Sequence, residues 1–526
     1  MRRCIALISL ATVIAIQGTA EPAFTNLTGR ISLDHTYDGG WEHFVGGGLA
    51  LLDCDADGFP DLYVAGGANP AALFRNTTRQ PESSLAFEAS EDRELALTGV
   101  TGAYPLDIDG DGILDLFVLR VGGNAVFRGF GDCRFRRVED SWGIDAGDAW
   151  TTAFSATWEQ GEDWPTLAVG NYVDRGDPDG PFETCDLHQL LRPAERGYQP
   201  TEPIGPGYCA LSMLFTDWSG SGRQDLWISN DRHYYVRDGR EQLFRISPAL
   251  REYSLKDGWQ TQKLWGMGIA SRDITGDALP EIAVTSMADQ KLFTRDARAG
   301  SAAFRSIAYE RGTTAHVPHF GDEGRPSTGW HVQFGDVDND GLDDLFIAKG
   351  NVNQMADAAM RDPDNLLMQL PDGNFVEVGF VAGVASTERG RGGALADLNR
   401  DGLLDLVVVQ RRAALVVYEN ESLETGNWLK VRLRQQSGNV NAVGAKIEIA
   451  ADSLNKFREI QVGGGHAGGQ AGYEHFGLGR RASVRLRVMW PDGATSEWID
   501  LPAGRHYVIW RDGVRLKPVE EATGLE

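Results

Sequence analysis

The chain has 526 residues, a formal net charge of −25, 64 glycines and 14 tryptophans. So acidic a composition argues against nucleic acid as a partner. The glycine and aromatic content suits tight turns around packed sheets, and the length accommodates one large repeat domain with a small additional domain.

Residues 1–20 have the pattern of an export signal. Arg2 and Arg3 precede an apolar run from Ile5 to Ile16, and Gly18-Thr19-Ala20 forms a small-residue cleavage site. The apolar run is shorter than a membrane span, and no other stretch approaches that length. We therefore expect a secreted or periplasmic mature protein without a transmembrane segment.

An acidic loop with aspartate at alternating positions recurs six times. The clearest copies start at Asp53, Asp107 and Asp336. The third of these reads Asp336-Val337-Asp338-Asn339-Asp340-Gly341 and closes on Asp344, just before an apolar strand. Oxygens at positions 1, 3, 5 and 9 of such a loop suit Ca²⁺, which takes about 6 to 8 oxygen ligands in a flexible geometry. The flanking residues are β-branched, aromatic and glycine-rich, so the flanking helices of an EF-hand are not expected.

The predicted calcium ligands form six sets. They are Asp53, Asp55, Asp57 and Asp61; Asp107, Asp109, Asp111 and Asp115; Asp217, Ser219, Ser221 and Asp225; Asp273, Thr275, Asp277 and Glu281; Asp336, Asp338, Asp340 and Asp344; and Asp397, Asn399, Asp401 and Asp405. The third set has only two carboxylates, and the fourth has Ala278 where glycine is expected. The alternative is a series of solvated turns capped by aspartate, against which six copies in register argue.

The spacing of the loops predicts the architecture. Their first aspartates fall at 53, 107, 217, 273, 336 and 397, so a seventh copy without ligands is expected near residue 158. Seven units of about 50 to 60 residues with several short strands each predict an all-β fold, a seven-bladed β-propeller over residues 21–425. The last unit lacks an outer strand. The segment 24–27 is therefore predicted to complete the seventh blade and close the ring.

Four cysteines follow the predicted signal. An oxidising compartment favours disulfides among them. Cys185 and Cys209 bracket a Pro- and Gly-rich insertion and are the expected pair. Whether Cys54 and Cys133 also pair stays open.

A different β-rich segment occupies residues 426–515, followed by a tail at 516–526. It contains Trp428-Leu429-Lys430-Val431-Arg432-Leu433, His475-Phe476-Gly477-Leu478-Gly479 and Trp490-Pro491-Asp492-Gly493. This segment resembles the ASPIC/UnbV domain, the upstream repeats resemble FG-GAP or VCBS repeats, and the combination is similar to the cartilage acidic protein family. The resemblance implies an exported calcium-binding propeller with a C-terminal β domain, associated with extracellular matrix in animal members. It implies no reaction.

The face opposite the calcium loops carries the remaining candidates. In a four-stranded blade, the loops between the first and second strands lie on one face. The connections from the second to the third strand, and from the fourth strand to the first strand of the next blade, lie on the opposite face. The weak candidates for a catalytic or binding site there are His233, Tyr234, His319, His331, Arg389 and Arg391. The preferred hypothesis is that this face engages an extracellular glycan or protein partner.

Two alternatives stay open. One is an exported propeller enzyme that acts on a polysaccharide or small molecule in an axial pocket, although GxSxG, P-loop, HExxH and dinucleotide motifs are absent from the sequence. The other is a calcium-dependent adhesion or matrix protein. His466, among glycines, is expected in a flexible loop, and the sequons at Asn26, Asn76 and Asn420 matter only in a eukaryotic secretory route.

Overall fold

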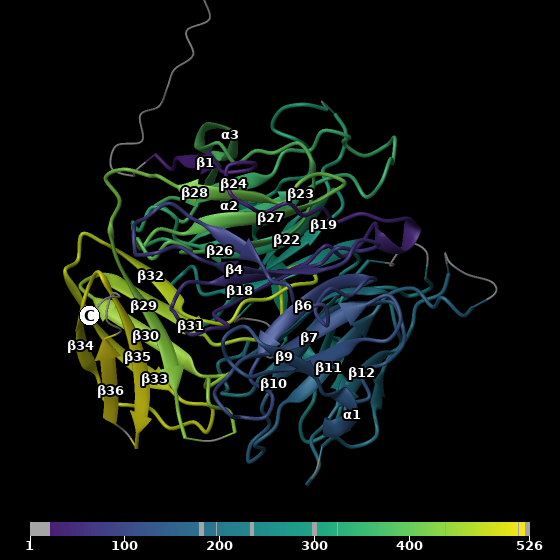
Figure 1. Ribbon diagram of the computed structural model, residues 1–526, viewed down its shortest axis with the longest axis horizontal. Coiled ribbons are helices and arrows are strands. Elements are labelled where there is room, and N and C mark those ends of the chain that lie inside the picture. Colours follow the sequence, from purple (N-terminus) through teal and green to yellow (C-terminus); the bar gives the residue numbers. More distant parts are fainter. Residues whose placement is uncertain are drawn as a thin grey trace, which may run out of the picture.

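The computed structural model describes residues 21–177, 183–195, 197–231, 236–296, 302–322, 324–436, 438–513 and 515–520. Over these residues the chain is mainly β-structure, organised in nine four-stranded sheets (Figure 1). Within the described part, no helix is both long enough and apolar enough to cross a membrane. The predicted export signal at 1–20 lies outside these residues.

Seven of the sheets are blades, each built from strands that pair antiparallel in sequence order. The first three are β2 (Leu49–Leu52), β3 (Asp61–Val64), β4 (Ala72–Asn76) and β5 (Phe87–Ala89); β6 (Val100–Leu106), β7 (Asp115–Arg120), β8 (Ala125–Gly129) and β9 (Phe135–Arg137); and β10 (Thr151–Thr157), β11 (Thr166–Asn171), β12 (His188–Leu191) and β13 (Glu202–Ile204). The next three are β14 (Ala210–Thr216), β15 (Asp225–Asn230), β16 (Gln242–Arg245) and β17 (Arg251–Glu252); β18 (Gly266–Arg272), β19 (Glu281–Ser286), β20 (Lys291–Arg295) and β21 (Phe304–Ser306); and β22 (Gly329–Gly335), β23 (Asp344–Lys349), β24 (Asn365–Gln369) and β25 (Phe375–Glu377). The seventh is β26 (Arg389–Ala396), β27 (Asp405–Arg411), β28 (Val416–Asn420) and β1 (Phe24–Asn26). Short helical turns accompany the blades: η1 (Trp41–His43), α1 (Glu139–Trp142), η2 (Leu255–Asp257), α2 (Ala308–Arg311) and α3 (Gly379–Ala382).

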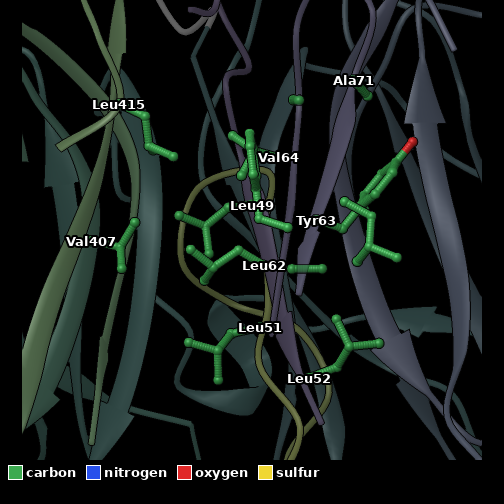
Figure 2. Close-up of a cluster of buried hydrophobic side chains, with 14 of the residues drawn as sticks. Leu49, Leu51, Leu52, Leu62, Tyr63, Val64, Ala71, Val407 and Leu415 are labelled. Carbon is green, nitrogen blue, oxygen red and sulfur yellow. The ribbon is translucent and has the colours of Figure 1, made fainter. Parts of the chain in front are cut away.

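The blades close into a ring. The first strands of successive blades contact one another in order, and β26 of the last blade contacts β2 of the first. Strand β1 pairs with β28, with Phe24 opposite Asn420, so the N-terminal strand completes the seventh blade as predicted. Figure 2 shows Val407 of the seventh blade facing Leu49 and Leu62 of the first, so apolar packing reinforces the closure.

The C-terminal domain consists of the two remaining sheets, ordered β32-β29-β35-β36 and β31-β30-β33-β34. Their strands are β29 (Asn427–Arg434), β30 (Lys446–Ala451), β31 (Leu454–Glu459), β32 (Glu474–Gly479), β33 (Ser483–Met489), β34 (Ile499–Pro502), β35 (Arg505–Asp512) and β36 (Arg515–Glu520). The domain has its own apolar core, which includes Leu429, Ile447 and Ile509. Strand β36 continues the first sheet to Glu520, so this stretch belongs to the domain and not to the tail expected from 516.

A glycine-rich segment of this domain, residues 461–471, lies along the propeller axis, and we call it the axial segment. It forms isolated β-bridges to the first strands of five blades, through Leu51, Ala103, Ala156, Leu214 and Ile269. Figure 2 shows a chain segment in the colour of the C-terminal domain passing beside Leu51 and Leu62. The protein's own backbone therefore runs along the axis of the ring.

Two disulfides restrain the loops. Cys185 and Cys209 are bonded, as expected, across the insertion between the third and fourth blades. Cys54 and Cys133, whose pairing the sequence left open, are also bonded. This second bridge ties the first acidic loop to the outer hairpin of the second blade.

Candidate metal centres

Carboxylates converge in three of the six acidic loops. The ligand atoms of Asp53, Asp55 and Asp57 lie within 4.8 Å of one another, and so do those of Asp107, Asp109 and Asp115 and those of Asp336, Asp338 and Asp340. The loops connect the first and second strands of their blades, so the folding of each blade brings these acids together. These are the three copies that read most clearly in the sequence.

The first aspartate organises each loop around itself. In the loop at Asp336, its Oδ2 accepts the backbone N–H of Gly341 at 2.9 Å. Gly341 has φ of 98°, a left-handed conformation that favours glycine. The Asp273 loop keeps the same bond, from Ala278 at 2.8 Å, although Ala278 must then adopt a φ of 69° at a cost on the order of 1 kcal/mol. The missing glycine therefore leaves the loop geometry intact.

The ninth residue anchors the loop to the blade. Asp344 accepts the N–H of Val337 through Oδ2 and the N–H of Gln369 through Oδ1, each at 2.9 Å. Asp61, Asp115 and Asp405 make the equivalent pairs of bonds. Burial raises the pKa of Asp344 well above its ordinary value. The predicted ninth ligand thus has a structural role of its own, because it joins the loop to the third strand.

Buried oxygens without a hydrogen-bond donor mark where a cation fits. Oδ1 of Asp53, Asp336 and Asp397 and Oδ2 of Asp338 are buried and accept no hydrogen bond. Burial is the main cause that raises the pKa of Asp53 to about 6 and that of Asp338 to about 7. Leaving a buried polar atom unpaired is costly, so these oxygens fit a hard divalent cation. Ca²⁺ bound there would supply charge neutralisation and hold the loop in place.

The Asp217 loop fits a cation less well. Asp217 Oδ1 already accepts the N–H of Ser221 at 2.9 Å. Oδ2 of Asp225 accepts the indole N–H of Trp218 at 3.0 Å and the hydroxyl of Tyr253 at 2.7 Å. Protein donors thus occupy the carboxylate oxygens that a metal would need. The sequence also offers only two carboxylates in this loop.

The candidates on the opposite face do not meet in one open pocket. His331 lies inside the ring, where its Nδ1 accepts the N–H of His466 at 3.2 Å, and burial lowers its pKa to about 4. Arg391 is fully buried, donates to backbone carbonyls including that of Phe44 at 2.9 Å, and lies 4.0 Å from the ring centroid of Trp330. His331 and Arg391 lie on β22 and β26, which are first strands of their blades. Because the first strands converge on the axis, both side chains lie beside the axial segment.

The other candidates lie apart from that group. His319 is partly exposed and pairs with Glu377 at 3.4 Å, while Arg389 is half-buried at the start of β26. His233 and Tyr234 lie outside the described residues. Beside the axial segment lies a cavity of about 140 Å³ that is lined by His331, Gln333 and Glu459.

Two features of the site were missed in the sequence. His466 was expected in a flexible loop, but it is fully buried in the axial segment, where its Nε2 accepts the N–H of Gly46 at 3.2 Å. The sequon residue Asn76 is also buried, and its amide donates to the carbonyls of Pro60 and of Leu398, which belongs to the acidic loop of the seventh blade. The same N-x-[ST] pattern occurs at the end of the third strand in two blades, at Asn76 and at Asn420. This repetition is the sequence signal from which the contact between blades could have been predicted.

Comparisons with known proteins agree with this architecture. A family model described as ASPIC and UnbV matches residues 435–515, and one described as an FG-GAP-like repeat matches residues 53–118. Cartilage acidic protein 1 of Mus musculus is 25% identical over 520 residues, covering 90% of this chain and 74% of the mouse protein. The Homo sapiens protein is 25% identical over 517 residues, covering 90% and 73%. The resemblance expected from the sequence is confirmed.

Among solved structures, BBS1N in complex with ARL6DN matches with a TM-score of 0.43 and 10% identity, covering 76% of this chain and 97% of that one. An Agrocybe aegerita lectin described as recognising non-reducing terminal N-acetylglucosamine matches with a TM-score of 0.40 and 14% identity, covering 72% and 94%.

Proposed function

We propose that this relative of cartilage acidic protein 1 is an exported, calcium-binding propeller that engages a glycan or protein partner through the face opposite the calcium loops. The observation that supports calcium is the set of buried carboxylate oxygens without donors, on Asp53, Asp336, Asp338 and Asp397. The two disulfides support export, because such bonds persist in oxidising compartments.

An aromatic cluster supports the choice of the opposite face. Trp41 is 43% exposed and lies edge-on to the buried Trp150, with ring centroids 4.9 Å apart, and Phe44 and Tyr172 pack against the same indole. These residues lie on connections of the face opposite the calcium loops. An exposed indole held rigid by other rings is suited to stack against a sugar ring or an apolar side chain.

Removal of calcium tests the first part of the proposal. Chelation is expected to lower the melting temperature, because a ligand that binds only the folded state stabilises it by about 2.7 kcal/mol per site at a hundred times its Kd. Magnesium should restore less of the melting temperature than calcium does, because it requires a tighter octahedral geometry. Scanning calorimetry with chelator, Ca²⁺ and Mg²⁺ makes the comparison, and equal melting in all three would reject a structural role for calcium.

A glycan array with the calcium-loaded protein tests the second part. We expect retention of a glycan class that Trp41→Ala abolishes and Trp510→Ala leaves intact, since Trp510 is a tryptophan of similar exposure, 40%, on the C-terminal domain. Retention with both variants would place the site elsewhere. Calcium-dependent self-association without glycan retention, measured by light scattering, would favour the adhesion or matrix alternative.

A further inference from the structure

Three lysines of the C-terminal domain each pair with the Oδ2 atom of an aspartate in a different acidic loop. The pairs, measured from lysine Nζ to aspartate Oδ2, are Lys430–Asp397 at 3.1 Å, Lys446–Asp217 at 2.9 Å and Lys456–Asp336 at 3.3 Å. The lysines come from β29, β30 and β31, which follow one another in the chain and belong to the two sheets of one domain. In every case the aspartate is the first residue of its loop.

The lysine and the predicted metal position use opposite sides of one carboxylate. Oδ2 of Asp336 accepts the N–H of Gly341 as well as Lys456, while its Oδ1 is buried without a donor. Asp397 repeats this arrangement with Gly402 and Lys430. A cation on Oδ1 and an ammonium group on Oδ2 would therefore share one negative charge.

Burial makes this sharing energetically important. The side chains of Lys430 and Lys456 are each 7% exposed, and those of their aspartates are 0% exposed. Water screens such charges poorly, so an ammonium group both stabilises an empty loop and repels an incoming divalent cation. Lys456 also lies 3.4 Å from Asp343 of the same loop. The Asp107 loop has a different counter-ion, because Arg128 of its own blade lies 2.8 Å from both Asp109 and Asp111.

We propose that the C-terminal domain acts as an internal counter-ion for the propeller: its lysines hold the calcium loops together without calcium and lower the calcium affinity of the loops that they contact. The inference rests on the proposed calcium function. It predicts that the loops of Asp336 and Asp397 bind calcium more weakly with their lysines than without them. By reciprocity, calcium binding weakens the docking of the domain to the same extent.

Removal of single lysines tests the inference. Lys456→Met and Lys430→Met keep an unbranched side chain but delete the charge, and Lys291→Met is the control, because Lys291 pairs with Asp289 in the fifth blade and not with a calcium loop. In calcium-depleted full-length protein, each test variant should melt at a lower temperature than the wild type. Calorimetric titration with calcium should show one site tightened by about 5-fold or more, and the control should change neither value.

The outcomes separate the inference from the function on which it rests. Unchanged or weaker calcium affinity in the lysine variants, with wild-type binding intact, overturns the inference alone. Absence of calcium binding and of any calcium-dependent melting in the wild type overturns the proposed function as well. Because the two lysines serve different loops, Lys430→Met carries the same test if Lys456→Met does not fold.

Discussion

Position within the loop decides what each acid contributes. The ninth aspartate accepts two backbone N–H groups, whereas Asp338, the third residue of its loop, keeps Oδ2 buried without a donor. Asp338→Asn should therefore remove about one bound calcium ion while leaving the propeller folded, which metal analysis of the purified protein and circular dichroism would check. Asp372→Asn, at an exposed turn, is the control, and an unchanged metal content in Asp338→Asn would count against a calcium site there.

Buried neutral histidines give the fold a sensitivity to acid. Burial lowers the pKa of His188 to about 4, while its Nδ1 accepts the N–H of Asn171. The folded pKa is below the ordinary value of 6.5, so the contribution of His188 is complete above pH 6.5 and is lost as pH falls toward 4, about 3 kcal/mol in all. Denaturant unfolding in excess calcium should show a smaller loss of stability over this range in His188→Gln, which can still accept the bond. An identical pH dependence in both proteins would contradict this assignment.

At the scale of the element, side-chain amides couple each blade to its neighbour. Asn420, at the end of β28, donates to the carbonyl of Val337 at 2.9 Å and of Leu404 at 3.1 Å, and Val337 belongs to the acidic loop of the preceding blade. Gln369 at the end of β24 donates in the same way to Ile274, in the loop of the fifth blade. These bonds hold the loops at fixed positions between blades, so the sequons at Asn76 and Asn420 are packing motifs in this fold.

Removal of one such amide should destabilise the ring. Asn420→Ala leaves two buried carbonyls without this donor, which should lower the free energy of unfolding by about 2 to 4 kcal/mol. The matched variant Asn374→Ala, whose amide bonds only to exposed Asp372, should change it little. Chemical denaturation of both variants gives the comparison, and equal stabilities would show that the coupling is dispensable.

At the scale of the whole molecule, the axial segment joins the two domains through close backbone contact. A Cβ added to Gly102 would lie 1.6 Å from the carbonyl oxygen of Ala467, so Gly102→Ala requires the segment to move. We expect a lower melting temperature and faster proteolytic release of the C-terminal domain. Gly40→Ala, where the added atom meets nothing within 4 Å, is the control. Unaltered melting and proteolysis of Gly102→Ala would mean that the segment adapts freely.

The recurrence of the acidic loops determined much of the architecture before any tertiary information. A repeat with a fixed period predicts one supersecondary unit per copy. The blades, the loop near residue 158 that lacks the ligands, and the closure by β1 all follow from this pattern. The convergence of Asp336, Asp338 and Asp340 is equally local, because alternating residues of one tight turn must face a common centre. Features within one blade are readable because the residues involved are neighbours in the chain, and the closure by β1 is readable because the last unit lacks its outer strand.

The tertiary structure alone decided what lies at the axis and at the domain interface. Glycines of the axial segment carry no hydrophobic pattern, and their partners, such as Leu51 and Ala156, lie hundreds of residues away in the chain. Lys430, Lys446 and Lys456 look like ordinary polar positions of surface strands until the domain docks. Contacts within a repeat can be read from sequence spacing. Contacts between two domains depend on how the folded domains pack against each other, and a single sequence contains no local signal for that packing.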